Sequence, residues 1–120
     1  MGYNLKSLTS ELQAKNMADD GLVAWGQNSS GALFGAVGAL LSSMHTISMH
    51  NDQILIIPFT SKQIKYDECQ AINKSDIVAA KVSGLLGAKL VLELKNGKKV
   101  KCNISQGKDA VKEILKRFGF

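Results

Sequence analysis

The chain has 120 residues, of which 45% are hydrophobic and 21% are charged. This length suits one domain, and the composition excludes a disordered chain, which would be poorer in apolar residues and richer in charge. The formal net charge is +5. The excess is uneven, because the chain up to Asp52 holds two basic and four acidic residues, whereas the remainder holds 13 basic and six acidic ones.

Only one of the 15 basic residues is an arginine, Arg117. Specific recognition of phosphates and bases favours the planar guanidinium group over the lysine ammonium. The lysine excess is therefore more typical of a solvated face than of sequence-specific nucleic-acid binding. An acidic lipid, nucleic acid or protein partner is the alternative interpretation.

The first predicted element is a short amphipathic helix over residues 5–15. Leu5, Leu8 and Leu12 recur at spacings of three and four residues, which places them on one face of a helix, and Asn4 is a suitable N-cap. A turn with two aspartates follows this helix. Residues 22–27 then predict a strand that carries the only tryptophan of the chain.

Residues 31–41 form the least usual stretch, because they contain only glycine, alanine, valine, leucine and phenylalanine. Three glycines disfavour both a helix and a regular strand. The stretch is about half as long as a membrane-spanning helix, so we expect no transmembrane segment. It is either an interface with another copy or a partner protein, or a part of the core, or a membrane contact. The candidate interface residues are Leu33, Phe34, Val37, Leu40 and Leu41.

Residues 46–59 predict a β-hairpin that turns at Asn51-Asp52, with a dense β-branched second arm. Pro58 lacks an amide hydrogen, so we expect it at an edge or a bulge. Further strands are predicted over residues 63–66 and 77–82, with a turn over residues 67–70 between them.

The last hairpin gives the clearest pattern. Leu90, Leu92 and Leu94 alternate with polar or smaller residues, Asn96-Gly97 is typical of a type I′ turn, and the returning strand alternates again. We expect Val100 and Cys102 inward and the intervening lysines outward. The helix predicted over residues 107–118 buries one stripe, which consists of Val111, Ile114, Leu115 and Phe118.

These elements predict one mainly β (α+β) domain over residues 1–120. It comprises an N-terminal helix and turn over residues 1–20, a β-barrel over residues 21–105 with the glycine-rich insert 31–41, and a C-terminal helix over residues 107–118.

The segment Ile54 to Arg117 resembles the bacterial pleckstrin-homology-like domains. The resemblance lies in Ile56-Ile57-Pro58-Phe59-Thr60-Ser61-Lys62-Gln63-Ile64, in Ser75-Asp76-Ile77-Val78, in Gly84-Leu85-Leu86-Gly87-Ala88-Lys89-Leu90 and in a final Gly-Lys hairpin. It implies a bent antiparallel β-barrel of about seven strands, in two nearly orthogonal sheets, that is capped by a C-terminal helix. It also implies a non-catalytic interaction or assembly module.

The chain departs from this family pattern in two respects. The family connects its first strands by a short loop, whereas this chain inserts residues 31–41. Relatives that bind phosphoinositides place several basic residues around the loop between their first two strands, and this sequence has none between Lys15 and Lys62. The resemblance therefore implies no phosphoinositide site.

Candidate catalytic and metal-binding groups all have simpler structural explanations. His45 and His50 are an odd number of residues apart, so on a strand they point to opposite faces and cannot share a metal; we expect both at the surface or at an edge. Cys69 and Cys102 form no spaced pair, and we expect free thiols in a reducing, cytoplasmic setting. The carboxylate pairs lie in turns, where they cap local amides. We predict no enzyme, no metal and no cofactor.

Two functions remain. In the first, the domain associates with itself or with another protein through residues 31–41. In the second, it binds anionic surfaces, acidic lipid or nucleic acid, through its lysine-rich second half. The candidate anion-binding residues are Lys95, Lys98, Lys99, Lys101, Lys112, Lys116 and Arg117.

Overall fold

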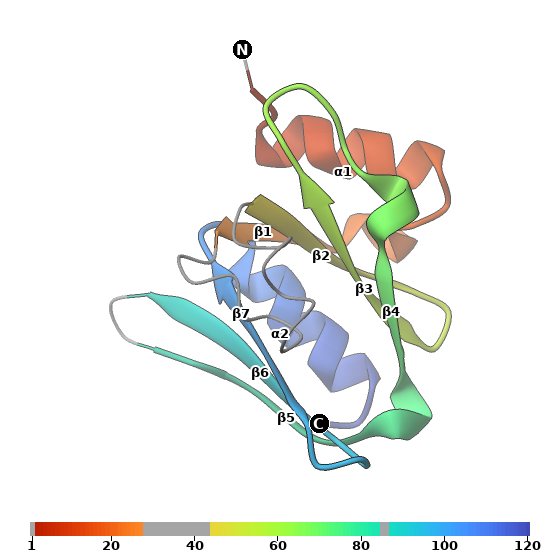
Figure 1. Cartoon of the computed structure of the whole chain (residues 1–120), viewed down its shortest axis with the longest axis vertical. Coiled ribbons are helices and arrows are strands. Elements are labelled where there is room, and N and C mark those ends of the chain that lie inside the picture. Colours follow the sequence, from red (N-terminus) through yellow and green to blue (C-terminus); the bar gives the residue numbers. More distant parts are fainter. Residues whose placement is uncertain (1, 28–43, 85–86) are drawn as a thin grey trace.

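The protein is described by a computed structural model, which covers residues 2–27, 44–84 and 87–120 (Figure 1). The helices are α1 (Leu5–Ala14) and α2 (Lys108–Arg117), with short 3-10 helices η1 (Asp19–Gly21), η3 (Tyr66–Glu68) and η4 (Lys74–Asp76). The strands are β1 (Val23–Gln27), β2 (Met44–His50), β3 (Gln53–Phe59), β4 (Gln70–Asn73), β5 (Ile77–Ser83), β6 (Ala88–Leu94) and β7 (Lys99–Ile104).

The strands form two antiparallel sheets. Sheet A has the order β1-β2-β3-β4, and sheet B has the order β5-β6-β7. The predicted α+β class, with seven antiparallel strands and a helix near each end, is thus confirmed. A closed barrel is not, because β4 and β5 are edge strands of different sheets in the described part of the chain.

The two inner strands of sheet A, β2 and β3, are buried on both faces. Along β3, Ile54 and Ile56 belong to the core shared with sheet B and α2, whereas Leu55, Ile57 and Phe59 belong to a second core under α1. A strand with two buried faces needs apolar residues at consecutive positions rather than at alternate ones. This explains the dense apolar run of β3.

Helix α1 covers the outer face of sheet A. The Asn4 side chain accepts a hydrogen bond from the Ser7 amide at 2.8 Å, and the Ser7 hydroxyl accepts one from the Asn4 amide at 2.9 Å, which forms a capping box. Leu8 and Leu12 are completely buried against the sheet. The predicted N-cap and buried face of this helix are confirmed.

Helix α2 packs between the two sheets (Figure 1). Its three buried side chains and that of the C-cap residue Phe118 are those predicted from the sequence: Val111, Ile114, Leu115 and Phe118. The helix ends in a Schellman motif, in which the Phe120 amide donates to the Leu115 carbonyl at 2.9 Å and Gly119 adopts a φ of 89°.

Between residues 60 and 73 one strand prediction is wrong and one strand was not predicted. Residues 63–66 form only an isolated bridge from Ile64 to Phe59, because the Thr60 hydroxyl accepts the Lys62 and Gln63 amides and bends the chain. Conversely, β4 begins at Gln70, where a turn was predicted. Its only buried residue is Ile72, so no alternating pattern marks it in the sequence.

Pro58 lies in β3, an inner strand of sheet A and not the predicted edge strand or bulge, but beyond the part of β3 that pairs with β4, so its missing amide hydrogen does no harm. The two-residue turn at Asn51-Asp52 makes His50 and Gln53 a hydrogen-bonded pair, so the odd-numbered residues of β3 bond to β2. The backbone of Pro58 therefore faces the β4 side, and β4 pairs with β3 only as far as Ile56. The Pro58 carbonyl still accepts the Lys65 amide at 2.9 Å.

The β6–β7 hairpin has the predicted register but a different turn. Val100 and Cys102 are buried, whereas Lys99 and Lys101 are exposed. The Gly97 amide donates to the Leu94 carbonyl and the Leu94 amide to the Lys98 carbonyl, both at 2.9 Å. Of the turn residues only Gly97 has a positive φ, 84°, so the connection is a three-residue turn with a glycine bulge, not a type I′ turn.

The two sheets meet along one side, where β1 approaches β7 and the segment that follows it. The Trp25 amide donates to the Gln106 carbonyl at 3.0 Å, and the Trp25 carbonyl accepts the Ser105 amide at 2.7 Å. The Asn103 side chain also donates to the Gln27 carbonyl at 2.9 Å. We call this contact the β1–β7 joint, defined by Trp25, Gly26, Gln27 and residues 103–107.

Two glycines permit the joint. A Cβ atom at Gly26 would lie 1.8 Å from the Asn103 carbonyl oxygen, and one at Gly107 would lie 2.6 Å from the Ala24 Cα atom. Gly107 also has a φ of 92°, which disfavours other residues, and it is the N-cap of α2. The same pair of glycines therefore sets the contact between the sheets and the start of the helix.

Replacing Gly26 by alanine should lower the free energy of unfolding by about 3 kcal/mol or more, because the neighbour that must move is a backbone carbonyl of the joint. Urea unfolding measures this. Gly87→Ala is the matched control, since a Cβ there meets no atom within 4 Å, and its stability should stay unchanged or rise slightly. An unchanged midpoint for Gly26→Ala would contradict the joint.

Candidate functional site

The candidate interface predicted from the apolar stretch lies outside the described residues. This concerns Leu33, Phe34, Val37, Leu40 and Leu41. The predicted anion-binding residues are all described, and the structure divides them into two groups.

The first group lies on the β6–β7 hairpin. Lys99 and Lys101 are exposed on the outer face of sheet B, because their neighbours Val100 and Cys102 point into the core. Lys95 and Lys98 lie at the turn that joins the two strands and are also exposed.

The second group lies on α2, on the opposite side of sheet B. Leu90 and Leu92 on the inner face of the sheet pack in one core with Val111 of the helix. Lys112 and Lys116 are exposed on this helix and cannot join the outer face of the sheet. The Arg117 guanidinium is bonded to Asp20 and, at 3.1 Å, to Glu113. These two carboxylates raise the pKa of Arg117.

Sheet B brings two further lysines to its outer face that were not among the predicted candidates. The register aligns Lys81 of β5 with Val91 and Lys101, and it aligns Lys89 of β6 with Ser83 and Asn103. Sequence reasoning missed them because it assigned charge to single hairpins, whereas this face combines three strands. The alternation of Lys81 with the apolar residues Ala80 and Val82, which are half-buried, could have indicated that Lys81 lies on the outer face of the sheet.

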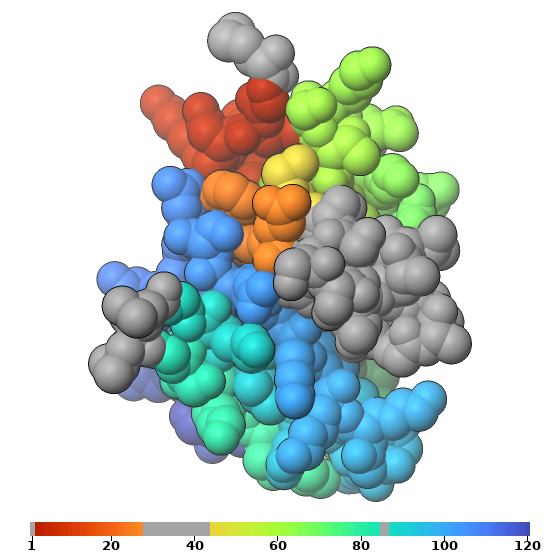
Figure 2. All heavy atoms as spheres, turned by 60° about the vertical axis from the view of Figure 1, so that its left-hand side comes forward, coloured from red at the N-terminus to blue at the C-terminus, as the bar shows by residue number. Residues whose placement is uncertain are grey.

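We define the basic face as the outward positions of sheet B. They are Ala79, Lys81 and Ser83 of β5, Lys89, Val91 and Glu93 of β6, and Lys99, Lys101 and Asn103 of β7. Glu93, its one acidic residue, pairs with Lys99 at 3.4 Å. Four lysines against one glutamate give this face a net charge of +3. Figure 2 shows the atoms of these strands, teal to blue, as a continuous surface over the lower front of the molecule.

The basic face contains no aromatic residue. A hollow on this face has a volume of about 260 Å³ and is lined by Ala79, Ala80, Lys81, Val91 and Glu93. The centre of the face carries small side chains with amines around them. This arrangement suits contact with a broad anionic surface better than binding of a small ligand, which requires a more enclosed pocket.

The two histidines do point to opposite faces of sheet A. His50 lies beside Asp19 on the α1 side, with Nδ1 and Oδ1 3.1 Å apart. His45 lies at the β1–β7 joint, where Nε2 is 3.1 Å from the Asn103 carbonyl oxygen. The expectation of a surface position is wrong for His45, which is completely buried, because its β1 partner Gly26 leaves room for it beneath β7.

Asp19 ties the N-terminal segment to the β2–β3 hairpin. Its Oδ2 atom accepts the Asn51 amide at 2.7 Å, so this turn carboxylate caps a distant amide and not a local one as predicted. Asn51 has a φ of 53°, and the bond supports this conformation. The Asn51 amide and the His50 side chain hold the pKa of Asp19 below its usual value.

The thiols are poorly suited to nucleophilic chemistry. Cys102 is completely buried, and burial raises the pKa of its thiol far above the usual range. Cys69 is half-buried, and burial raises the pKa of its thiol as well. Since the thiolate is the reactive form, neither group is activated at neutral pH.

The described residues also contain no group of three histidine, cysteine, aspartate or glutamate side chains placed to hold a metal ion. Of the helices in the described ranges, none is long and apolar enough to cross a membrane.

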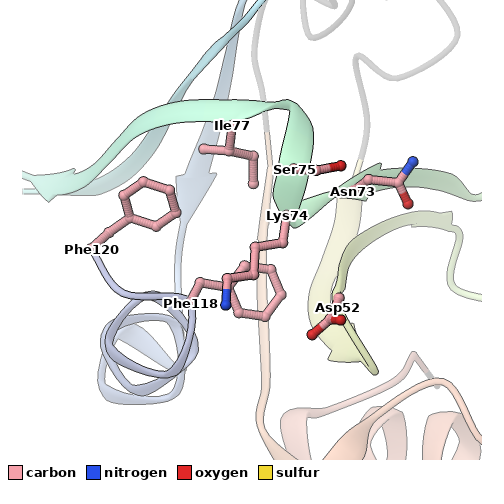
Figure 3. Close-up of a pocket in the computed structure, with 7 residues that line it drawn as sticks. All are labelled: Asp52, Asn73, Lys74, Ser75, Ile77, Phe118 and Phe120. Carbon is pink, nitrogen blue, oxygen red and sulfur yellow. The ribbon is translucent and has the colours of Figure 1, made fainter.

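Two recesses lie on the side of the molecule opposite the joint. One has a volume of about 490 Å³ and lies between the end of α2 and the connection from β4 to β5 (Figure 3). Its lining residues are Asp52, Asn73, Lys74, Ser75, Ile77, Phe118 and Phe120. The other has a volume of about 400 Å³ and lies between β4 and the β6–β7 turn.

Comparison with known proteins finds no family model, no curated protein and no solved structure that matches this chain.

The stability of the protein should depend on the charge of Asp19. A folded-state pKa below the unfolded one means that the carboxylate stabilises the fold above about pH 4 and that this contribution disappears as the pH falls through the folded pKa. Asp19→Asn should therefore be less stable than the wild type at pH 6, and the difference should shrink towards pH 2.5 in urea titrations.

The control for this prediction is Asp67→Asn, because the Asp67 carboxylate makes no hydrogen bond or ion pair with the described residues. Its stability should match the wild type at both pH values. A stability difference for Asp19→Asn that is equal at pH 6 and pH 2.5 would show that the Asp19 charge plays no part.

Proposed function

We propose that the chain is a non-catalytic binding module of pleckstrin-homology-like architecture, and that the basic face of sheet B binds a surface rich in anionic lipid headgroups. Two antiparallel sheets of seven strands with a terminal helix packed between them support the architecture. The family pattern and the structure differ at β4 and β5, where the sheets separate.

The observation that carries the binding proposal is the gathering of lysines from three strands onto one face of sheet B. Lys81 and Lys89 are exposed, and neither forms an ion pair with the described residues. Lys99 pairs with Glu93 across the strands, and the face as a whole keeps a net positive charge. An anionic partner surface would neutralise it.

The composition of the face favours a lipid surface over nucleic acid. Single-stranded nucleic acids are held by aromatic side chains on which bases stack, and the basic face has none. Bidentate contacts to phosphates and bases use arginine, and the face has only lysine. Lysine clusters near a membrane act through charge alone, at about 1 kcal/mol for each lysine.

Binding to vesicles that contain 30% phosphatidylserine should therefore be strong at low salt and weak at 0.5 M salt. Replacing Lys81 and Lys89 by glutamine removes two charges, worth about 2 kcal/mol together, and should weaken binding roughly 30-fold. Sedimentation with vesicles measures this. Lys112→Gln with Lys116→Gln is the matched control on α2, and it should change binding much less.

Two outcomes would contradict this function. The first is that the α2 control pair weakens vesicle binding as much as the basic-face pair does, which would indicate a general effect of net charge. The second is that neutral phosphatidylcholine vesicles bind the chain equally well, which would exclude an electrostatic contact.

Self-association through residues 31–41 stays a prediction from the sequence, since these residues lie outside the described ranges. Burial of leucine and phenylalanine side chains contributes about 1.5–3 kcal/mol each, enough for several together to support an interface. Light scattering should show an oligomer for the wild type and a smaller species for Phe34→Asp. A monomeric wild type, or a variant with the same mass, would contradict it.

A further inference from the structure

On the side of the molecule opposite the β1–β7 joint, two edge strands have no further strand beside them in the described part of the chain. Sheet A has β1 and β4 as its edge strands, and sheet B has β5 and β7. Because β1 and β7 meet at the joint, β4 and β5 remain, and β4 forms the right-hand edge of sheet A in Figure 1.

The register of β4 shows which of its backbone groups face outward. The Lys74 amide donates to the Asp52 carbonyl at 2.7 Å, in line with the pairing of Asn73 with Gln53. Hydrogen-bonded pairs alternate along an antiparallel ladder, so Ile72 and Gln70 bond to β3. Ala71 and Asn73 therefore direct their backbone groups away from β3.

Three groups are thus available at this edge: the N–H and C=O of Ala71 and the N–H of Asn73. None of them has a backbone or side-chain partner in the part of the chain that the structure describes. Ala71 is exposed, so the groups are accessible. These groups are spaced along β4 as the donors and acceptors of any β-strand are, so the backbone of an added strand could pair with them.

The edge of β4 also lacks the features that commonly block strand addition. Its four residues, Gln70 to Asn73, include no charge and no proline, and its ladder with β3 has no bulge. The edge of β5, in contrast, carries Lys81 and a bulge between Ile77 and Ala79. Charges and bulges protect edges against pairing, so β4 is the unprotected one of the two.

The 400 Å³ recess runs beside this edge. Gln70, Ala71 and Ile72 form one wall of it, and the β6–β7 turn forms the other wall with Leu94, Lys95 and Lys98. Ile72 and Leu94 give the recess an apolar part. The recess at Asn73 and Lys74 adjoins the same strand, as Figure 3 shows from the side of α2.

The charges of this recess fit an acidic occupant. The amines of Lys95 and Lys98 form no ion pair with the described residues, and Asp76 is the one acidic residue in the lining. The Asp76 carbonyl accepts the Lys95 amide at 2.9 Å, which holds the turn close to the start of β5. A carboxylate near both amines would be favoured by charge.

We propose that the free edge of β4 binds an extended acidic peptide segment of a partner protein, which adds to sheet A as a further strand. Its backbone pairs with Ala71 and Asn73. One apolar side chain contacts Ile72 and Leu94, and a neighbouring carboxylate contacts Lys95 and Lys98. This site is separate from the basic face of sheet B and does not depend on the function proposed for that face.

The first test measures fluorescence polarisation with a capped, labelled peptide, Glu-Val-Glu-Ile-Glu. Ala71→Pro removes the outward amide hydrogen but no bond to β3, so the fold should survive as it does at an edge proline. This variant should weaken binding at least tenfold, whereas Ala71→Val, which keeps the amide, should bind like the wild type. The peptide Lys-Val-Lys-Ile-Lys, with the same apolar residues, should not bind.

A second measurement locates the peptide. Amide chemical shifts of the labelled full chain should change at residues 70–73 and 94–98 on addition of the acidic peptide, and they should stay constant at Lys81 and Lys89. Lys95→Gln with Lys98→Gln should weaken binding at least fivefold.

Three results would overturn the proposal. The first is that the folded Ala71→Pro protein binds the acidic peptide as tightly as the wild type. The second is that the amide chemical shifts change on the basic face instead, which would indicate attraction by net charge. The third is that the wild type is a dimer that Ala71→Pro converts to a monomer, in which case a second copy of the chain occupies the edge.

Discussion

The close approach of β1 to β7 is the contact on which the rest of the structure depends. It links two sheets that share no ladder, and it places α2, whose N-cap Gly107 lies against Ala24, between them. Only glycine at positions 26 and 107 allows backbone atoms to come so near each other. His45 adds a side-chain contact from β2 to the Asn103 carbonyl. One joint therefore fixes the position of both sheets and of the helix that fills the core between them.

Joining the sheets on one side leaves them apart on the other, and the candidate binding surfaces follow from this asymmetry. The connection from β4 through η4 leads the chain into sheet B without pairing β4 and β5, so one recess lies beside β4 and another at the connection that follows it. Among the described residues, the outer face of sheet B has no hydrophobic core against it, whereas α1 packs on the outer face of sheet A.

Much of the fold could be predicted from local patterns. A single helix or strand that packs on a core has a periodic pattern of apolar residues that is visible in the sequence. This holds for the spacing of Leu8 and Leu12, for the buried stripe of α2 and for the alternation around Val100. Strand β4 and the burial of His45 could not be predicted, because they depend on contacts with distant residues. Of the site, the hairpin lysines were recognised, but Lys81 and Lys89 join them only through strand register. The separation of Lys112 and Lys116 from that face likewise follows from the packing of α2 inside the sheets.

Native-state amide hydrogen exchange tests the joint most directly. If the joint holds the sheets together, the Trp25 and Ser105 amides, which bond across it, should exchange only through global unfolding, as slowly as the amides between β2 and β3. In the same data the Ala71 amide should exchange rapidly. Fast exchange at Trp25 and Ser105, with protection kept in β2 and β3, would show that the sheets separate without unfolding and would contradict the account.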